Sequence, residues 1–219
     1  MGFITNRNLI ASKHETMAFT GCWLDSLGTP APSGSWMIYG KSGSGKTSFA
    51  LQLSKYLSQF DRILFWSIEQ GNTASFHRSW MRTKMGECGK NITVADENEL
   101  LLDETHMFDS IVSKMNSKKS SIGILVIDSV TPLRAKNFDI RKYESLRKRL
   151  KNKLLIWISH EKMGLPDTKV GDYILKMSEI KMHCKGFKVF INTRTGDKLH
   201  DFVIWEEGAK EYFIHQSID

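Results

Sequence analysis

Apolar residues gather in short runs along the chain. Residues 62–68, 122–127 and 154–158 are nearly continuously apolar, and residues 36–39 form a shorter run before them. Strands with one exposed face alternate apolar and polar side chains, whereas central parallel strands are buried on both faces and do not. The runs therefore predict the central strands of a parallel sheet.

The segments between these runs have helical periodicity. Residues 46–60, 73–85 and 103–115 place apolar side chains three or four positions apart, as amphipathic helices do. Alternation of strand and helix requires crossover connections between parallel strands, which are almost always right-handed. The expected fold class is α/β, with helices flanking a mostly parallel central sheet.

The pattern changes after Gly171. Turn signals at residues 195–197 and 207–208 separate short segments that favour β-structure. These segments would form an antiparallel C-terminal edge on the parallel sheet. Residues 1–28 have the weakest pattern and are expected to be an N-terminal segment with a role in oligomerisation, which leaves residues 29–219 as the main domain. The short strands are expected at residues 173–177, 188–192, 201–205 and 211–214.

Composition fits one intracellular domain. The chain has 219 residues, of which 41% are hydrophobic, enough to bury the core of a single α/β domain. Cys22, Cys88 and Cys184 lie far apart with no CxxC pair, which argues against a disulfide framework or a zinc site. No apolar run approaches the ~20 residues that span a bilayer, and the N-terminus lacks the apolar stretch of a signal peptide. We expect a cytoplasmic protein without a membrane partner.

The net charge of +7 is concentrated in one segment. Residues 134–153 contain nine Lys or Arg residues against Asp139 and Glu144, which accounts for the whole surplus and leaves the rest of the chain neutral. A basic surplus confined to one segment is typical of a local site for a polyanion. The other interpretation is a solvated charged helix, because runs of charge are commonly only that.

A phosphate-binding pattern stands near the N-terminus. Residues 40–47 read GKSGSGKT and match GxxxxGK[ST] in full, after an apolar strand and at the start of a helix. In that context a glycine-rich loop directs backbone N–H groups toward phosphates, Lys46 supplies a cation, and the Thr47 hydroxyl is a ligand for Mg²⁺. The alternative is a fortuitous turn rich in glycine and serine. The residues expected to bind ATP are Gly40, Lys41, Ser42, Gly43, Ser44, Gly45, Lys46, Thr47 and Ser48.

A carboxylate at the end of another strand completes the expected metal site. The apolar run 124–127 ends at Asp128, the arrangement of a Walker B motif, in which the carboxylate supports Mg²⁺ beside Thr47. Asp128 could instead cap a helix, since Ser129 and Thr131 stand beside it. With the P-loop upstream, metal support is the favoured interpretation.

These motifs resemble a known family. The Val-Ile-Asp-Ser sequence at residues 126–129, the glutamate Glu69 at the tip of the strand after the P-loop helix, and a polar residue ending the next strand together look like the RecA/DnaB/KaiC core. The resemblance covers about residues 20–214 and implies the RecA-like P-loop NTPase fold. In this family the glutamate polarises the attacking water, which gives Glu69 the role of general base. A solvated turn residue is the alternative.

Two further residues take their roles from this resemblance. His160 ends a strand where family members commonly carry a glutamine that senses the γ-phosphate, although it could merely cap the strand. Residues 191–196 and 202–204 resemble the strand, turn and strand in which hexameric DnaB-type members carry a Lys-x-Arg pair. Arg194 then corresponds to an arginine finger that reaches the neighbouring subunit's γ-phosphate. Asn192 replaces the lysine of the pair, and an ordinary surface arginine is the alternative.

The basic segment lies directly after the Walker B strand, where RecA-like proteins place a loop that faces single-stranded DNA. Tyr143, Leu146 and Leu150 fall on one helical face and leave the basic side chains outward. Such a cluster would bind phosphates without sequence preference and with strong salt dependence. Residues 161–169 occupy the place of a second DNA loop and are expected to be short, polar and flexible. The predicted DNA-binding residues are Arg141, Lys142, Arg147, Lys148, Arg149 and Lys151.

Together these features predict an enzyme that hydrolyses the β–γ phosphoanhydride of ATP with Mg²⁺. In the first hypothesis, a homo-oligomeric ring or filament couples hydrolysis to single-stranded DNA in recombination, strand annealing or replication. The compact chain resembles the minimal recombinases of bacteriophages and mobile elements, which implies a bacterial cytoplasm. The second hypothesis is a KaiC-like ATPase that remodels or regulates protein partners. The expected catalytic residues are Lys46, Glu69, His160 and Arg194, and the expected metal ligands are Thr47 and Asp128.

Overall fold

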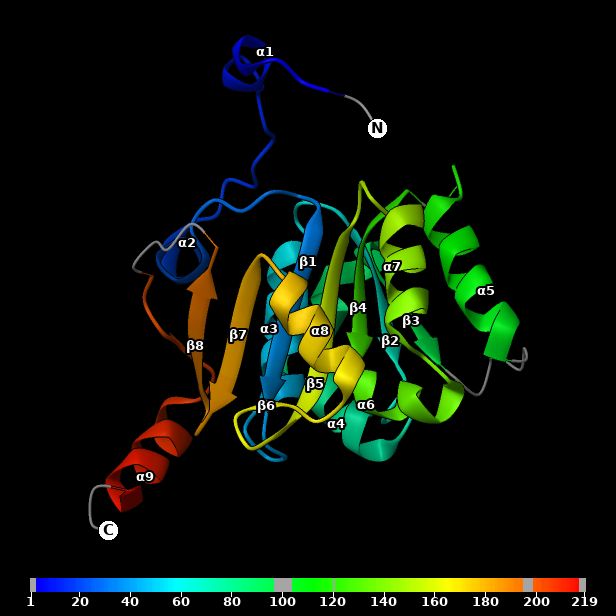
Figure 1. Cartoon of the computed structure of the whole chain (residues 1–219). Coiled ribbons are helices and arrows are strands. Elements are labelled where there is room, and N and C mark those ends of the chain that lie inside the picture. Colours follow the sequence, from blue (N-terminus) through cyan, green and yellow to red (C-terminus); the bar gives the residue numbers. More distant parts are fainter. Residues whose placement is uncertain (1–2, 97–103, 120, 195–198, 217–219) are drawn as a thin grey trace.

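The computed structural model describes residues 3–96, 104–119, 121–194 and 199–216, which contain a central nine-stranded sheet (Figure 1). The strands are β1 (Gly34–Gly40), β2 (Arg62–Ser67), β3 (Ile92–Asp96), β4 (Ile122–Asp128), β5 (Leu154–Lys162), β6 (Leu165–Pro166), β7 (Ile180–Lys185), β8 (Lys188–Thr193) and β9 (Phe202–Val203). Their order is β3-β2-β4-β5-β1-β7-β8-β9, with β6 paired to β5. The first six strands in this order are parallel, whereas β8 and β9 pair antiparallel. The predicted parallel sheet with an antiparallel C-terminal edge is confirmed.

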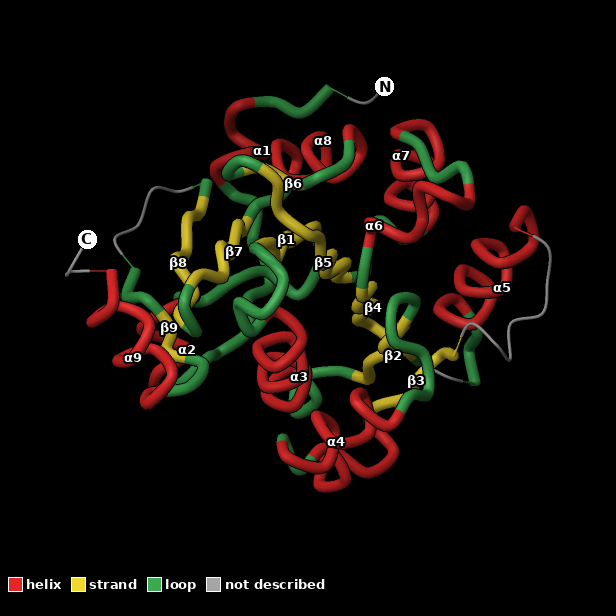
Figure 2. Tube along the Cα trace, turned by 90° about the horizontal axis from the view of Figure 1, so that it is seen from below, coloured by secondary structure: helices red, strands yellow, loops and turns green. Residues whose placement is uncertain are grey.

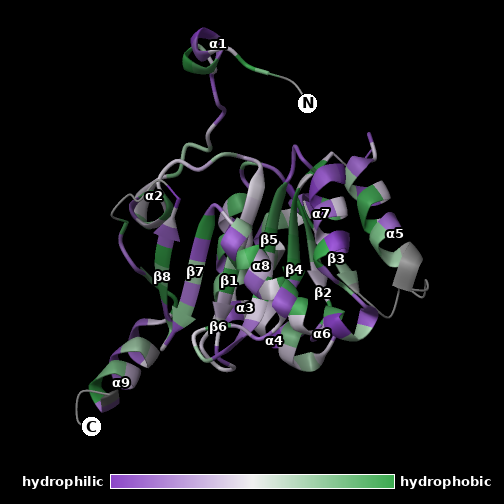
Figure 3. Ribbon diagram, viewed as in Figure 1, coloured by the Kyte–Doolittle hydropathy of each residue, from purple (hydrophilic) through white to green (hydrophobic). Residues whose placement is uncertain are grey.

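Helices cover both faces of the sheet (Figures 1 and 2). Central strands carry hydrophobic residues, and hydrophilic residues concentrate on the outer sides of the helices (Figure 3). On one face lie α3 (Lys46–Leu57) and α4 (Ala74–Arg82), and on the other lie α5 (Glu104–Asn116), α7 (Ile140–Arg149) and α8 (Lys169–Met177). The short connecting helices are η1 (Met85–Asn91), α6 (Val130–Leu133) and η2 (Arg134–Lys136).

Alternate side chains of each central strand pack into opposite halves of the core. Trp36 and Ile38 of β1 pack in the core under α3, whereas Met37 packs in the core under α7 and α8. All seven residues of β4 are buried. Because a parallel strand between two helical layers has no exposed side, the continuous apolar runs of the sequence correctly predicted β1, β2, β4 and β5.

The strand predicted at residues 173–177 is wrong. These residues belong to α8, which begins where the Thr168 hydroxyl accepts a hydrogen bond from the backbone N–H of Gly171. Val170 and Ile174 are both buried, and their spacing of four places them on one side of a helix. The capping threonine was the sequence signal that distinguished this helix from a strand.

The strand predicted at residues 211–214 is also wrong, because these residues lie in α9 (Glu206–Gln216), which projects from the lower left of the molecule in Figure 1. Glu206 and Glu207 lie in its first turn, where their negative charge is stabilised by the positive end of the helix dipole. The edge was instead completed by β7, which the sequence did not predict and which pairs parallel with β1 and antiparallel with β8. The strand at residues 188–192 is confirmed as β8, and the one at residues 201–205 as the shorter β9.

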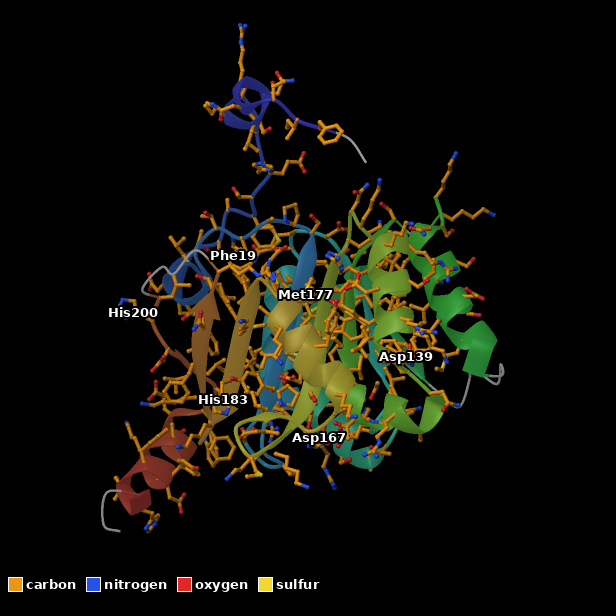
Figure 4. All side chains as sticks on the ribbon, viewed as in Figure 1. Phe19, Asp139, Asp167, Met177, His183 and His200 are labelled. Carbon is orange, nitrogen blue, oxygen red and sulfur yellow. The ribbon has the colours of Figure 1, made fainter. Side chains whose placement is uncertain are left out.

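The second half of the N-terminal segment packs into the main core. Met17, Phe19 and Leu27 are each at most 5% exposed, and Trp23 of α2 (Gly21–Leu27) stacks on Phe202 with ring centroids 4.4 Å apart. Figure 4 labels Phe19 close to α2. In contrast, α1 (Asn6–Ile10) buries no side chain and projects away from the body (Figure 1). A role for residues 1–28 in oligomerisation stays a prediction.

The described helices include none long and apolar enough to cross a membrane. Cys22, Cys88 and Cys184 are free thiols. Complete burial raises the pKa of the Cys184 thiol to about 12, so this cysteine behaves as a small apolar core residue.

Candidate nucleotide-binding site

The P-loop joins β1 to α3, and two of its glycines are required by close contacts. A Cβ atom at Gly40 would collide with the carbonyl group of Cys184 on β7. Gly45 precedes α3 with a φ of +98°, a conformation that side chains disfavour, and a Cβ atom there would press on Ile204 and Phe187. The two glycines therefore let the P-loop approach the backbone of β7 and the side chains of Ile204 and Phe187 closely.

Lys46 and the start of α3 provide the positive charge of the loop. The Lys46 side chain is buried, and its Nζ donates to the Lys41 carbonyl oxygen at 2.9 Å. Burial lowers the pKa of Lys46. The Ser44 hydroxyl is buried and has no hydrogen-bond partner among the described residues, and the first turn of α3 carries no acidic residue. A buried cation, an unpartnered hydroxyl and a helix N-terminus together fit a phosphate chain.

Thr47 and Asp128 meet at the carboxyl end of the sheet. The Thr47 hydroxyl donates to Asp128 Oδ2 at 3.2 Å, and the Asp128 side chain lies in the protein interior, 2% exposed. Burial and, secondarily, the negative charge of Glu69 raise the pKa of Asp128 to about 6. A carboxylate whose ionised form is destabilised by burial gains from a nearby cation. The Asp128 carboxylate and the Thr47 hydroxyl both offer oxygen ligands, which suit Mg²⁺. The predicted metal ligands are thus close enough to share one ion.

Glu69 follows β2 at the same edge of the sheet. The backbone N–H groups of Ile68 and Glu69 donate to the Asp128 carbonyl oxygen at 2.6 and 3.0 Å. The Ser129 hydroxyl donates to Glu69 Oε2 at 2.9 Å, and His160 Nε2 lies 3.0 Å from both carboxylate oxygens. The bond with His160 lowers the pKa of Glu69 and raises the pKa of His160. Glu69 is therefore held ionised beside Asp128.

His160 belongs to an ordered hairpin, which corrects the flexible loop expected at residues 161–169. The chain turns back from β5 into β6, with Glu161 opposite Pro166. The Asp167 N–H donates to the His160 carbonyl oxygen at 3.0 Å. The Glu161 carboxylate is nearly buried and lies 2.7 Å from Nε2 of His183 on β7. These contacts fix the hairpin. The contact observed for His160 is with Glu69, and its sensing of a γ-phosphate stays a prediction.

A cavity of about 870 Å³ adjoins the P-loop helix, at a position that no sequence motif predicted. Phe187 and Trp205 line it and pack edge to face, with ring centroids 5.2 Å apart. Arg82 Nη2 donates to the Ser48 hydroxyl at 3.2 Å inside the lining. The volume is in the range of small-molecule sites, and flat aromatic side chains suit a purine. The residues of the lining are Ser48, Gln52, Lys55, Arg82, Thr83, Phe187, Ile204 and Trp205.

Arg194 lies at the opposite end of the sheet from its own P-loop. It follows Thr193, which pairs with Ile180 at the start of β7, whereas Gly40 pairs with the end of β7. Its Nη2 donates to the carbonyl oxygens of Lys176 and Met177 at 3.1 Å each, at the C-terminus of α8. The structure therefore does not bring Arg194 to the site of its own chain, and a role in a neighbouring subunit's site stays a prediction.

Five of the six predicted DNA-binding residues lie on the outer side of α7, whose Tyr143 and Leu146 are buried as expected, and the sixth, Lys151, lies in the turn after the helix. Arg147 pairs with Glu144 at 3.2 Å, and Arg149 with Asp109 at 2.6 Å. Lys142 donates to a backbone carbonyl. The other three cations make no ion pair with described residues. They are Arg141, Lys148 and Lys151.

No protein-family model and no curated protein matches the chain. Among solved structures, the chain resembles a KaiC-like protein from the hyperthermophilic archaeon Pyrococcus horikoshii at 15% sequence identity and a TM-score of 0.60, over 86% of this chain and 93% of that one. It resembles the flagellar accessory protein FlaH from Methanocaldococcus jannaschii at 14% identity and a TM-score of 0.60, with the same coverage. At such low identities the structural similarity establishes the fold alone, and function has to be argued from the site. The chain has the fold of the RecA-like P-loop ATPases.

Proposed function

We propose that this protein hydrolyses ATP at the β–γ phosphoanhydride with Mg²⁺. The convergence of Lys46, the Thr47 and Asp128 pair, and Glu69 at one edge of the sheet carries this proposal. Lys46 and Thr47 open α3 directly after the P-loop, Asp128 ends β4, and Glu69 follows β2. These groups match the phosphate cation, metal support and water-activating base that phosphoryl transfer to water requires.

Each side chain has a distinct task in this reaction. Lys46 exchanges its bond to the Lys41 carbonyl for the β and γ phosphates, where its charge neutralises the developing negative charge. Thr47 and Asp128 would hold Mg²⁺, which when bound supplies further neutralisation of the phosphates. Glu69 orients the attacking water and accepts its proton. The cavity lined by Trp205 would hold the nucleoside.

We further propose that hydrolysis is coupled to single-stranded DNA in recombination, strand annealing or replication, through the outward cations of α7 and Lys151 in the turn after it. Phosphate contacts of this kind confer affinity without sequence choice. We also propose that the protein works as a homo-oligomer. Arg194 lies at the opposite end of the sheet from its own P-loop, so it could reach a phosphate only in another subunit.

A KaiC-like activity on protein partners is the second candidate function. Two observations favour it. The fold resembles a KaiC-like protein and FlaH. The tip of the β5–β6 hairpin, close in sequence to His160, exposes 92% of Met163 and 51% of Leu165, and exposed apolar side chains near one another suit a protein surface better than a phosphate backbone.

Phosphate release from ATP tests the proposal and separates the two candidates. The purified protein should release phosphate from ATP in the presence of Mg²⁺, and phosphate release should stop when EDTA removes the metal. Single-stranded DNA should raise the rate in the first candidate and leave it unchanged in the second. Absence of hydrolysis under all these conditions, with ATP bound, would assign the site to nucleotide binding alone.

A further inference from the structure

A second cavity, of about 770 Å³, lies at the amino end of the sheet. Gly34 and Ser35 at the start of β1 line it, together with the end of α7 and Met177 at the end of α8. Gly40, at the other end of β1, opens the P-loop. A strand rises about 3.3 Å per residue, so β1 separates the two sites by roughly 20 Å. Figure 4 labels Met177 above Asp167, and Asp167 lies on the side of the sheet where the parallel strands have their carboxyl ends. We call this second cavity the amino-edge groove.

Positive charge predominates in the amino-edge groove. Arg147 is paired with Glu144, and the Lys153 ammonium group donates to a backbone carbonyl. Lys148 and Lys151 have neither an ion pair nor a hydrogen bond to described residues. These two lysines are therefore available to an anion. The charged residues of the lining are Arg147, Lys148, Lys151, Lys153, Glu144 and Glu179.

The remaining lining suits phosphate oxygens better than nucleobases. Ser33 and Ser145 bring hydroxyl groups to the groove, and hydroxyls commonly donate to phosphate oxygens. Ser35 also lines the groove, but it is buried and its Oγ accepts a hydrogen bond from the Tyr143 hydroxyl. The described lining residues include no aromatic side chain. Proteins that hold the bases of single strands usually stack them on aromatic side chains. A nucleic acid in this groove would therefore be held by its backbone, with its bases directed elsewhere.

We propose that the amino-edge groove binds the sugar–phosphate backbone of nucleic acid, at a site separate from the nucleotide cavity. Lys148 and Lys151 contact the phosphates, and the serine hydroxyls add hydrogen bonds to their oxygens. The choice of nucleic acid as the ligand rests on the proposed function, whereas the phosphate chemistry rests on the groove itself. Inorganic polyphosphate carries the same chemistry without sugar or base, so it should compete for the groove.

Charge reversal in the groove tests this assignment. Binding of a fluorescent 30-nucleotide single strand is measured by anisotropy over a range of salt concentrations. Lys148→Glu/Lys151→Glu should weaken binding at least tenfold, and it should flatten the salt slope by about 1.4, since each phosphate contact contributes about 0.7. The matched control Lys84→Glu/Lys90→Glu makes the same change in net charge at two exposed positions, one directly before η1 and one within it, and should bind nearly as the parent does. Circular dichroism checks that both variants remain folded.

A neutral obstruction separates the groove from general electrostatics. Ser145→Trp fills the groove without altering charge and should also weaken binding, while ATP hydrolysis without DNA stays unchanged because the groove is remote from Lys46. If the control double variant weakens DNA binding as much as the groove double variant, the groove is not the binding site, and the proposed DNA coupling stays intact. If the protein binds polyphosphate but does not bind DNA, the groove is a phosphate site and the proposed DNA function is wrong. Stronger competition by polyglutamate than by polyphosphate would assign the groove to an acidic protein and overturn the proposal.

Discussion

His160 Nε2 lies 3.0 Å from both carboxylate oxygens of Glu69. Only Oε2 also accepts the Ser129 hydroxyl, so Oε1 depends on His160 alone among the hydrogen bonds of the described residues. If His160 turns toward a γ-phosphate, Oε1 becomes free to accept a hydrogen bond from water. The contact therefore offers a physical connection between the presence of ATP and the exposure of the proposed base.

Replacement of Glu69 by Gln should leave ATP binding intact and abolish turnover. The amide keeps the shape of the side chain but cannot accept the proton of the attacking water. Loss of a general base typically costs ~10²–10⁴ in rate. Phosphate release and calorimetric ATP binding, measured on the same preparation, check the two halves of this expectation. Hydrolysis at the parent rate would show that another group activates the water.

The Glu69–His160 pair should make stability depend on pH. The lowered pKa of Glu69 contributes stability above its ordinary value of 4.5, and that contribution is lost as the pH falls through the folded value. The raised pKa of His160 contributes fully below its ordinary value of 6.5 and is lost as the pH rises through the folded value. The stability difference between the parent and His160→Gln should therefore be largest between pH 4.5 and 6.5. Urea unfolding at pH 5.5 and 8.5 measures it, and a difference independent of pH would contradict the pairing.

Lys46→Ala should weaken MgATP binding by at least ~100-fold, because it removes a buried charge-assisted donor to the β and γ phosphates. Lys41→Ala is the matched control. Lys41 is an exposed residue, and its contact with Lys46 is made by its backbone carbonyl oxygen, which alanine retains. Isothermal calorimetry distinguishes the two variants. Similar losses from both would mean that the loop attracts ATP by its overall charge and not by a positioned lysine.

Trp205→Ala should weaken ATP binding roughly tenfold, since stacking on an aromatic side chain contributes ~1–3 kcal/mol per base and 1.4 kcal/mol is a factor of ten. Trp205 is half exposed in the free protein and can adapt to a bound base. Inorganic tripolyphosphate carries no base, so its affinity should not change, and Trp205→Phe should retain most of the ATP affinity. Equal losses for ATP and tripolyphosphate would make Trp205 a structural residue.

The phosphate end of this site could be predicted from sequence because its chemistry is local. Residues 40–47 form one uninterrupted motif, and Asp128 and Glu69 directly follow apolar strands. In a parallel sheet the carboxyl ends of strands share an edge, so the strand pattern alone predicts that these residues meet. In the structure the Thr47 hydroxyl lies 3.2 Å from Asp128 Oδ2, whereas the roles of these residues stay predictions.

The nucleoside end could not be predicted for the opposite reason. Ser48, Arg82, Phe187 and Trp205 come from separate segments, and no periodicity or motif relates them. Their convergence depends on β7 lying beside β1, and β7 was not predicted. The ordered hairpin after His160 was likewise missed, because the partly buried pair of Glu161 with a histidine 22 residues later leaves no local signal.

Arg194 has two roles to separate, because it already holds the C-terminus of α8 through the carbonyl oxygens of Lys176 and Met177. A structural role predicts that Arg194→Ala lowers the melting temperature and that nothing added in trans restores activity. A role as an arginine finger predicts something different, since the residue would act in the site of a neighbouring subunit.

Arg194→Ala should bind ATP normally and hydrolyse it ~10³–10⁵-fold more slowly, the usual effect of losing an arginine finger. Parent activity per subunit should rise with protein concentration, because each site is completed by a second copy. Mixing Arg194→Ala with Glu69→Gln should restore partial activity, since some mixed interfaces pair an intact Glu69 site with an intact Arg194. A restored rate cannot come from a residue that only caps α8 within its own chain. If the mixture stays inactive and the parent's specific activity is independent of concentration, each subunit works alone and Arg194 serves only to hold the end of α8.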